Sequence, residues 1–136
     1  MKLPFYKQEF WFSCFATCMK MVLEYYGVIK SERDLRVFLK TTPSYGTIWE
    51  IAEREIKGMG FELIWKKFWS LEELNLLIKQ PVPVIVGIWS KEEADKHAVV
   101  VVDVSGNTVT LIDPEYGELV NMDKTKFLEL GVGGTT

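Results

Sequence analysis

The second half of the chain is dominated by runs of strand-forming residues whose spacing favours an antiparallel sheet. Residues 82–89 are continuously apolar, which is typical of a central strand, although Pro83 weakens its start. Two further runs, 98–104 and 108–112, are separated only by Ser105-Gly106-Asn107, a hairpin signal. Shorter strands are predicted at 61–65 and 118–121.

The first half of the chain instead predicts helices. Residues 13–26 are apolar on nearly every face, Ser13 is a candidate cap, and Gly27 stands where helices commonly stop. Three further helices would each follow a Ser or Thr that has an acidic residue three positions later; they are predicted near 32–40, 48–58 and 71–79. Helices followed by an antiparallel sheet define the α+β class. A length of 136 residues fits one domain, so we predict a single domain over residues 1–136.

Charge and hydropathy argue against two classes of partner. The formal net charge is −3, from 16 basic and 19 acidic residues, and provides no electrostatic footprint for DNA or RNA. No apolar run approaches the roughly 18 residues that cross a bilayer. Residues 1–10 also lack the apolar stretch of a signal peptide. We therefore expect a cytoplasmic protein with no membrane span and no nucleic-acid partner.

The two cysteines are the first candidates for chemistry. Cys14 and Cys18 lie four positions apart on one predicted helix, which is a poor geometry for a disulfide. With a single distant histidine they supply too few ligands for zinc, so no metal or cofactor is expected. Cys14 would lie in the first helical turn, where unpaired backbone N–H groups and the helix dipole favour a thiolate. Cys18 lies one turn further inside and is expected in the core.

Three more residues complete a candidate nucleophilic site around Cys14. His97, the only imidazole, opens a predicted strand at the rim of the sheet and could act as base and leaving-group acid. Asp113, at the end of the next strand, could accept a hydrogen bond from the other ring nitrogen. Gln8, six residues before Cys14, offers an amide to an oxyanion beside the Cys14 backbone N–H. Each residue alone has an ordinary structural explanation, but together they predict nucleophilic catalysis.

These residues fall in two segments that resemble the bacteriocin-processing cysteine peptidases, which cut after double-glycine leaders. Residues 8–27, QEFWFSCFATCMKMVLEYYG, resemble the nucleophile helix of that family with its preceding Gln and its Tyr-Tyr-Gly end. Residues 97–117, HAVVVVDVSGNTVTLIDPEYG, are similar to its histidine and Asp-Pro segment. The resemblance implies a papain-like fold, a peptide or protein substrate, and these site residues: Cys14, His97, Asp113 and Gln8.

The chain departs from the family pattern on both sides of Cys14. Phe15 follows it where the family usually has Gly, and Ser13 precedes it where an acidic residue is common. Because Gly permits close approach of a substrate backbone, two alternatives stand beside a cysteine peptidase. The chain could be an inactive peptide-binding module with Phe15 blocking the cleft, or an acyltransferase that uses the same nucleophile.

Two other conspicuous features have ordinary structural explanations. The aromatic run Phe10-Trp11-Phe12, together with Phe15, is expected to pack around the start of the first helix; the alternative is that part of it walls a substrate cleft. The terminal Gly133-Gly134 resembles the double glycine at which leaders are cut, but Gly-rich ends are common and we expect a flexible tail.

The chemistry also constrains the register of the predicted hairpin. Side chains alternate between the faces of a strand, so His97 and Asp113 can meet only if odd positions pair with odd ones. A two-residue turn at Ser105-Gly106 with a regular ladder would place Asp113 opposite Ala98, on the face away from His97. We therefore predict a three-residue loop at 105–107, or else a compensating bulge between residues 98 and 112.

Overall fold

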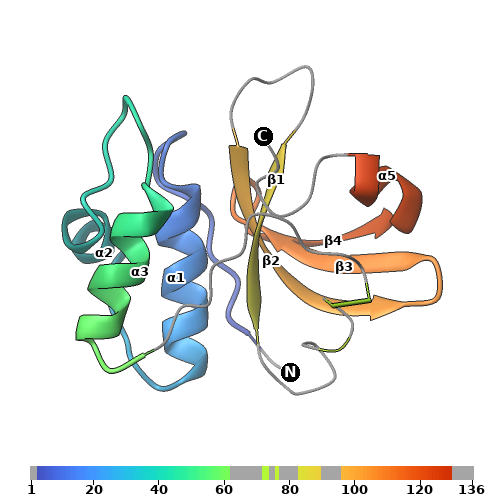
Figure 1. Ribbon diagram of the computed structural model, residues 1–136, viewed down its shortest axis with the longest axis horizontal. Coiled ribbons are helices and arrows are strands. Elements are labelled where there is room, and N and C mark those ends of the chain that lie inside the picture. The colour runs from blue at the N-terminus through green and yellow to red at the C-terminus, as the bar shows by residue number, and fades with distance from the viewer. Residues whose placement is uncertain (1–2, 62–71, 74–75, 77–82, 90–95, 130–136) are drawn as a thin grey trace.

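Helices lie beside a four-stranded antiparallel sheet in the computed structural model of the chain, which describes residues 3–61, 72–73, 76, 83–89 and 96–129 (Figure 1). The helices of this layer are α1 (Cys14–Tyr25), α2 (Glu32–Phe38) and α3 (Trp49–Gly58). The strands are β1 (Val84–Trp89), β2 (Lys96–Ser105), β3 (Thr108–Asp113) and β4 (Glu118–Asp123), followed by α5 (Lys124–Glu129). The predicted α+β class, with helices first and sheet second, is confirmed.

Helix α1 is the central element of the helical layer, because it packs against both α2 and strand β2. The apolar sequence explains this position, since its side chains are buried over most of the helix; they are Phe15, Ala16, Thr17, Cys18, Met19, Met21 and Leu23. The helix ends before Gly27, whose φ of +86° is the left-handed conformation that glycine adopts without strain. Ser13 is the N-cap residue as predicted, but its hydroxyl bonds to the backbone N–H and carbonyl of Phe10 instead of capping the helix.

The other predicted helix starts have different outcomes. The Ser31 side chain accepts a hydrogen bond from the Asp34 N–H at 3.0 Å, which confirms that cap. The predicted Thr47 cap is wrong: α3 begins one residue later, with Ile48 at the N-cap, while the Thr47 hydroxyl pairs with that of Thr41 at 2.7 Å. The predicted strand at 61–65, most of the predicted helix at 71–79 and the Gly133-Gly134 tail lie outside the described residues.

Both faces of the sheet are covered in its centre, which explains why β2 is continuously apolar from Ala98 to Val102. One face packs into the core cluster that includes α1, through Ala98, Val100 and Ile112. The other face belongs to a second cluster closed by Phe127 of α5, a helix that we did not predict from the sequence. A strand with no solvent-facing side loses the alternation of apolar and polar residues.

The β2–β3 hairpin contains the bulge that the chemistry requires. Its turn has two residues, Gly106-Asn107, because Ser105 pairs with Thr108, so the predicted three-residue loop is wrong. The register then shifts between Val101 and Asp103, and beyond this bulge Val100 pairs with Ile112. The shift restores odd-to-odd pairing, so the alternative prediction of a compensating bulge is confirmed. His97 and Asp113 therefore share one face of the sheet.

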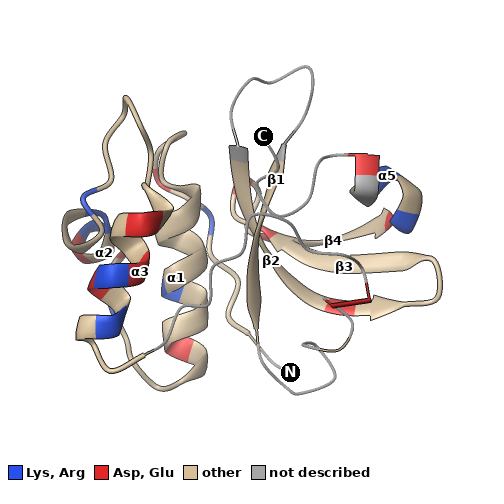
Figure 2. Ribbon diagram, in the orientation of Figure 1, with Lys and Arg blue, Asp and Glu red and all other residues tan. Residues whose placement is uncertain are grey.

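Charged residues gather on α2, α3 and α5, whereas most of the sheet is uncharged (Figure 2). Within the described ranges, none of the helices has the length and apolar character needed to cross a membrane.

Candidate active site

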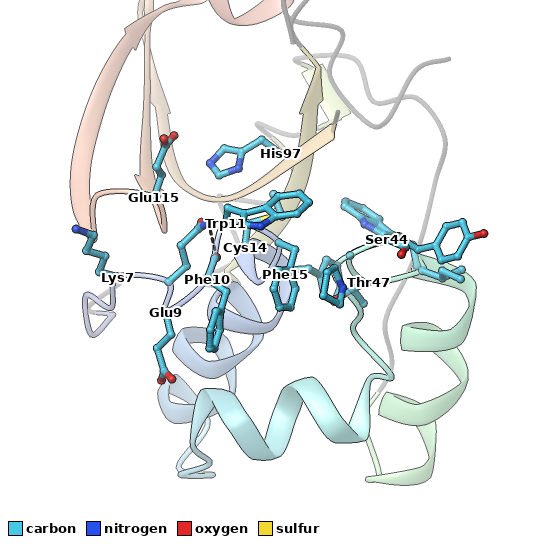
Figure 3. A pocket seen from close by; sticks show the side chains of 18 of the residues that line it. Lys7, Glu9, Phe10, Trp11, Cys14, Phe15, Ser44, Thr47, His97 and Glu115 are labelled. Atoms are coloured by element: carbon cyan, nitrogen blue, oxygen red, sulfur yellow. Dashed lines mark hydrogen bonds between the residues drawn. The ribbon is translucent and has the colours of Figure 1, made fainter. Parts of the chain in front are cut away.

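A cleft of about 760 Å³ opens where the start of α1 meets the rim of the sheet (Figure 3). Three of the four predicted site residues line it, namely Gln8, Cys14 and His97. Its other walls are the segment 7–12, the residues 43–50 that lead into α3, and Glu115. The fourth predicted residue, Asp113, lies directly behind His97.

His97 and Asp113 form a close pair between strands β2 and β3. The distance from His97 Nε2 to Asp113 Oδ1 is 2.6 Å, and both side chains are largely buried. The same carboxylate oxygen accepts the Glu115 backbone N–H at 2.9 Å, which fixes its orientation. The structure thus brings together the two residues that the register argument linked.

His97 carries a strongly perturbed pKa. Burial of the ring disfavours its charged form, but hydrogen bonds and charge interactions with Asp113 and Cys14 outweigh burial and raise the pKa of His97 to about 10. The ring is therefore an imidazolium at neutral pH, with a proton on each nitrogen. Because Nε2 donates to Asp113, Nδ1 is the nitrogen that remains for the Cys14 sulfur.

The two cysteines lie in different environments. Cys14 is partly exposed in the cleft, whereas Cys18 is completely buried in the core, as predicted, and both are free thiols. Burial raises the pKa of Cys18 well above its ordinary value, and the negative charges of Cys14 and Asp113 raise it further. Only Cys14 therefore combines solvent access with a cationic partner.

Gln8 is held at the cleft by hydrogen bonds from its backbone and its side chain. Its backbone N–H donates to the Pro114 carbonyl at 2.7 Å, and its Nε2 donates to the Phe10 carbonyl at 2.8 Å. Its Oε1 is buried and has no partner among the described residues. Since an amide nitrogen carries two hydrogens, one N–H remains for a substrate oxygen.

The turn after β3 brings the sheet against the Gln8 segment. Gly117 has a φ of +68°, and a Cβ built on it would lie 2.9 Å from the Lys7 backbone nitrogen. Only glycine permits this approach of two backbones. The same turn supplies the Pro114 carbonyl that holds Gln8.

Three described residues could offer ligand atoms to a metal ion. One atom each of His97, Asp113 and Glu115 lies within 4.8 Å of the others. A metal at this position would compete with the 2.6 Å hydrogen bond between His97 and Asp113.

Comparison with known proteins gives the fold and the family of the chain. The structure is similar to the peptidase domain of Streptococcus ComA, a bi-functional ABC transporter involved in a quorum sensing pathway. The TM-score is 0.78 at 23% identity, over 95% of this chain and 93% of that one, so the two share a fold. No curated protein matches the sequence significantly. The model of the Peptidase C39 family matches residues 2–130. The chain belongs to the Peptidase C39 family. Membership confirms the resemblance to the bacteriocin-processing cysteine peptidases.

The aromatic residues of this C39 chain differ partly from expectation. Phe15 is buried as predicted, 2% exposed, and its ring packs against Trp49 at a centroid distance of 5.0 Å. Core packing is wrong for Phe10 and Trp11, which are 45% and 73% exposed; they line the cleft, as the alternative prediction had it.

Sequence reasoning missed one wall of the C39 cleft and one buried residue behind it. The turn around Tyr45, closed by backbone hydrogen bonds between Thr42 and Gly46, forms one wall. Its Pro-Ser-Tyr-Gly composition indicated a turn but not its location. The second is Glu32, a buried carboxylate behind the Gln8 segment. An acidic residue in the first turn of a helix is ordinary, so nothing in the sequence indicated its burial.

Proposed function

We propose that this C39 peptidase hydrolyses a peptide bond with Cys14 as nucleophile. The observation that carries the proposal is the His97–Asp113 pair at 2.6 Å, which leaves the other ring nitrogen for Cys14 at the open cleft. An imidazolium beside a thiol stabilises the thiolate, which is the nucleophilic form. Asp113 stabilises the imidazolium and holds the ring in one orientation.

The acylation step follows from these positions. The Cys14 thiolate adds to the scissile carbonyl carbon, forming a C–S bond and moving an electron pair onto the oxygen. The free N–H of Gln8 and the Cys14 backbone N–H are the proposed donors to that oxyanion. The C–N bond then breaks, and the His97 imidazolium gives its proton to the departing amine.

Deacylation uses the same residues in reverse. Neutral His97 takes a proton from water, and the resulting hydroxide adds to the thioester carbon. Collapse of this second oxyanion breaks the C–S bond, releases a carboxylic acid and regenerates the thiolate–imidazolium pair. No group outside the chain, the substrate and water is needed to balance these steps.

The position of Phe15 supports catalysis over an inactive binding module. Phe15 forms part of the cleft wall, but its ring is 2% exposed and packs against Trp49, so it presents little surface to a substrate. The Phe15 side chain packs in the core cluster beside the cleft. The missing glycine therefore leaves the region around Cys14 open, and the cleft contains Cys14 and His97 together.

The deciding experiment is digestion of a peptide library in ¹⁸O-labelled water, with Cys14→Ala as the control. We expect products with ¹⁸O in the new carboxyl group from the natural chain and none from the variant. Acyl groups transferred to added amines without ¹⁸O incorporation would indicate an acyltransferase. Peptide binding without any cleavage would indicate the inactive module.

A further inference from the structure

A buried carboxylate outside the cleft ties helix α2 to the segment that carries Gln8. Glu32 lies in the first turn of α2 and is 1% exposed. It lines no part of the cleft around Cys14. We infer that Glu32 is a positioning residue for the Gln8 oxyanion donor, a role that rests on the function proposed above.

The Glu32 carboxylate has three hydrogen-bond donors around it. Oε1 accepts the Glu9 backbone N–H at 2.8 Å and the Thr17 hydroxyl at 2.6 Å. Oε2 accepts Nε of Arg36 at 2.9 Å, one helical turn further along α2. A buried charge is tolerated only with such partners, so the carboxylate is confined to this position.

The contact with Glu9 matters because it holds the peptide group that follows Gln8. The Gln8 N–H is bound from the sheet side by the Pro114 carbonyl at 2.7 Å. The Glu9 N–H is bound from the helical side by Glu32 at 2.8 Å. The Cα of Gln8 lies between these two fixed amides, so the root of its side chain is held from both layers.

Arg36 extends the same support to the other end of the Gln8 side chain. Its guanidinium lies 4.5 Å from the centroid of the Phe10 ring, and its Nη2 is 3.3 Å from Glu9 Oε1. Glu9 and Phe10 form part of the cleft wall, and Figure 3 shows their side chains extending from it towards the helical layer. The Phe10 carbonyl is the acceptor that orients Gln8 Nε2. The Glu32–Arg36 pair thus steadies both the root of Gln8 and the acceptor of its amide.

Two reactions of Cys14 separate this role from a merely structural one. Alkylation by iodoacetamide displaces iodide and forms no oxyanion, so its rate reports the thiolate alone. Acylation by p-nitrophenyl acetate passes through a tetrahedral oxyanion, so its rate also reports Gln8. The ratio of the two rates isolates the oxyanion contribution without requiring the natural substrate.

We expect Glu32→Ala to lower the acylation rate about tenfold or more and to leave the alkylation rate within about twofold. If this variant does not fold, Glu32→Gln serves instead. Its amide oxygen can still accept from Glu9 and Thr17, but its NH₂ faces Arg36, so a smaller loss of about threefold is expected. Gln8→Ala alone should lower the acylation rate roughly 100-fold. When the Glu32 substitution is added to Gln8→Ala, the acylation rate should fall no further.

Two matched controls complete the test. Thr17→Val removes a hydrogen bond to the same carboxylate but not the link to Glu9, so it should lower the melting temperature and leave the rate ratio unchanged. Glu55→Gln changes a carboxylate that pairs with the exposed Lys40 and Arg54, and it should alter neither the melting temperature nor the rate ratio. Three outcomes would overturn the positioning role of Glu32. In Glu32→Gln, the acylation and alkylation rates could fall in parallel, or neither rate could fall. In the Gln8→Ala background, the Glu32 substitution could lower the acylation rate as much as it does in the natural chain. Absence of acylation in the natural chain would instead overturn the proposed function, and this role with it.

Discussion

At the scale of single residues, Cys14 and Cys18 share one helix but differ in access and in partners. Cys14 lines the cleft beside His97, whereas Cys18 is 0% exposed and burial raises its pKa. We expect iodoacetamide at pH 6 to alkylate Cys14 at least about 100-fold faster than Cys18, because only Cys14 is held near an imidazolium. Peptide mass spectrometry of the native protein over time measures both rates.

The control for this labelling is His97→Ala. Removing the imidazolium should slow Cys14 alkylation at pH 6 without exposing Cys18. Unchanged reactivity of Cys14 in this variant would mean that His97 is not its partner.

His97 offers a direct test of its own ionisation because it is the only histidine in the chain. Its ring protons therefore give an unambiguous NMR signal. We expect a midpoint that reflects a pKa of about 10 for His97, and a clear downward shift in Asp113→Asn, which loses the charge but keeps the shape. A midpoint near 6.5 in the natural chain, the value of a free imidazole, would contradict the ion pair.

At the scale of elements, the bulge in β2 shows both the reach of sequence reasoning and its limit. The alternation of side chains along a strand required an odd-length loop or a bulge, because His97 and Asp113 must share a face of the sheet. The sequence could not locate the bulge, since Val99 to Val102 are four identical side chains. Backbone pairing with β3 decides which valine is the extra one, and that choice depends on the whole sheet.

The turn after β3 supports the Gln8 segment, and Gly117 is the position that tests this. Gly117→Ala places a Cβ against the Lys7 backbone and strains a φ of +68°, so it should displace Gln8 from the Pro114 carbonyl. We expect a loss of about 1–3 kcal/mol in unfolding free energy and at least a tenfold lower acylation rate. Urea unfolding and p-nitrophenyl acetate acylation measure these effects.

Gly106→Ala is the matched control for Gly117→Ala. Gly106 has a similar φ of +57°, but a Cβ there meets nothing within 4 Å. It should therefore cost stability through backbone strain alone and leave the acylation rate unchanged. Equal effects of the two substitutions on acylation would show that the approach to Lys7 is unimportant.

At the scale of the whole molecule, the raised pKa of His97 makes stability depend on pH. The folded ring holds its proton up to a pKa of about 10, whereas an unfolded histidine loses it near 6.5. The stabilisation that protonated His97 gives to the folded state is therefore complete below about pH 6.5 and is lost as pH rises towards 10. We expect the difference in unfolding free energy between the natural chain and His97→Asn to shrink over this interval.

Urea denaturation at several pH values gives this difference. A Cys14→Ala substitution in both chains removes the titration of the thiol. It should also bring the upper end of the interval below pH 10, because Cys14 supports the charge on His97. If the difference in unfolding free energy grew with pH, it would contradict a raised pKa of His97 in the folded chain.

The order of helices and strands could be predicted from the spacing of apolar residues, because a long segment with one clear pattern indicates its own secondary structure. Helix α5 was missed, since six residues give a weak helical signal. Phe127 of this helix belongs to the apolar cluster that covers the outer face of the sheet. Glu32 could not have been found, because its burial results from α1, α2 and the Gln8 segment meeting in space.

The order of the cleft residues along the chain has a consequence for protein synthesis. Gln8 and Cys14 are synthesised before His97, Asp113 and Pro114, which follow roughly a hundred residues later in the chain. Until strands β2 and β3 dock beside α1, Cys14 has no imidazolium next to it and Gln8 lacks the hydrogen bond to the Pro114 carbonyl. The proposed nucleophile, base and oxyanion donor can therefore act together only after the β2–β3 hairpin has been synthesised and has docked beside α1.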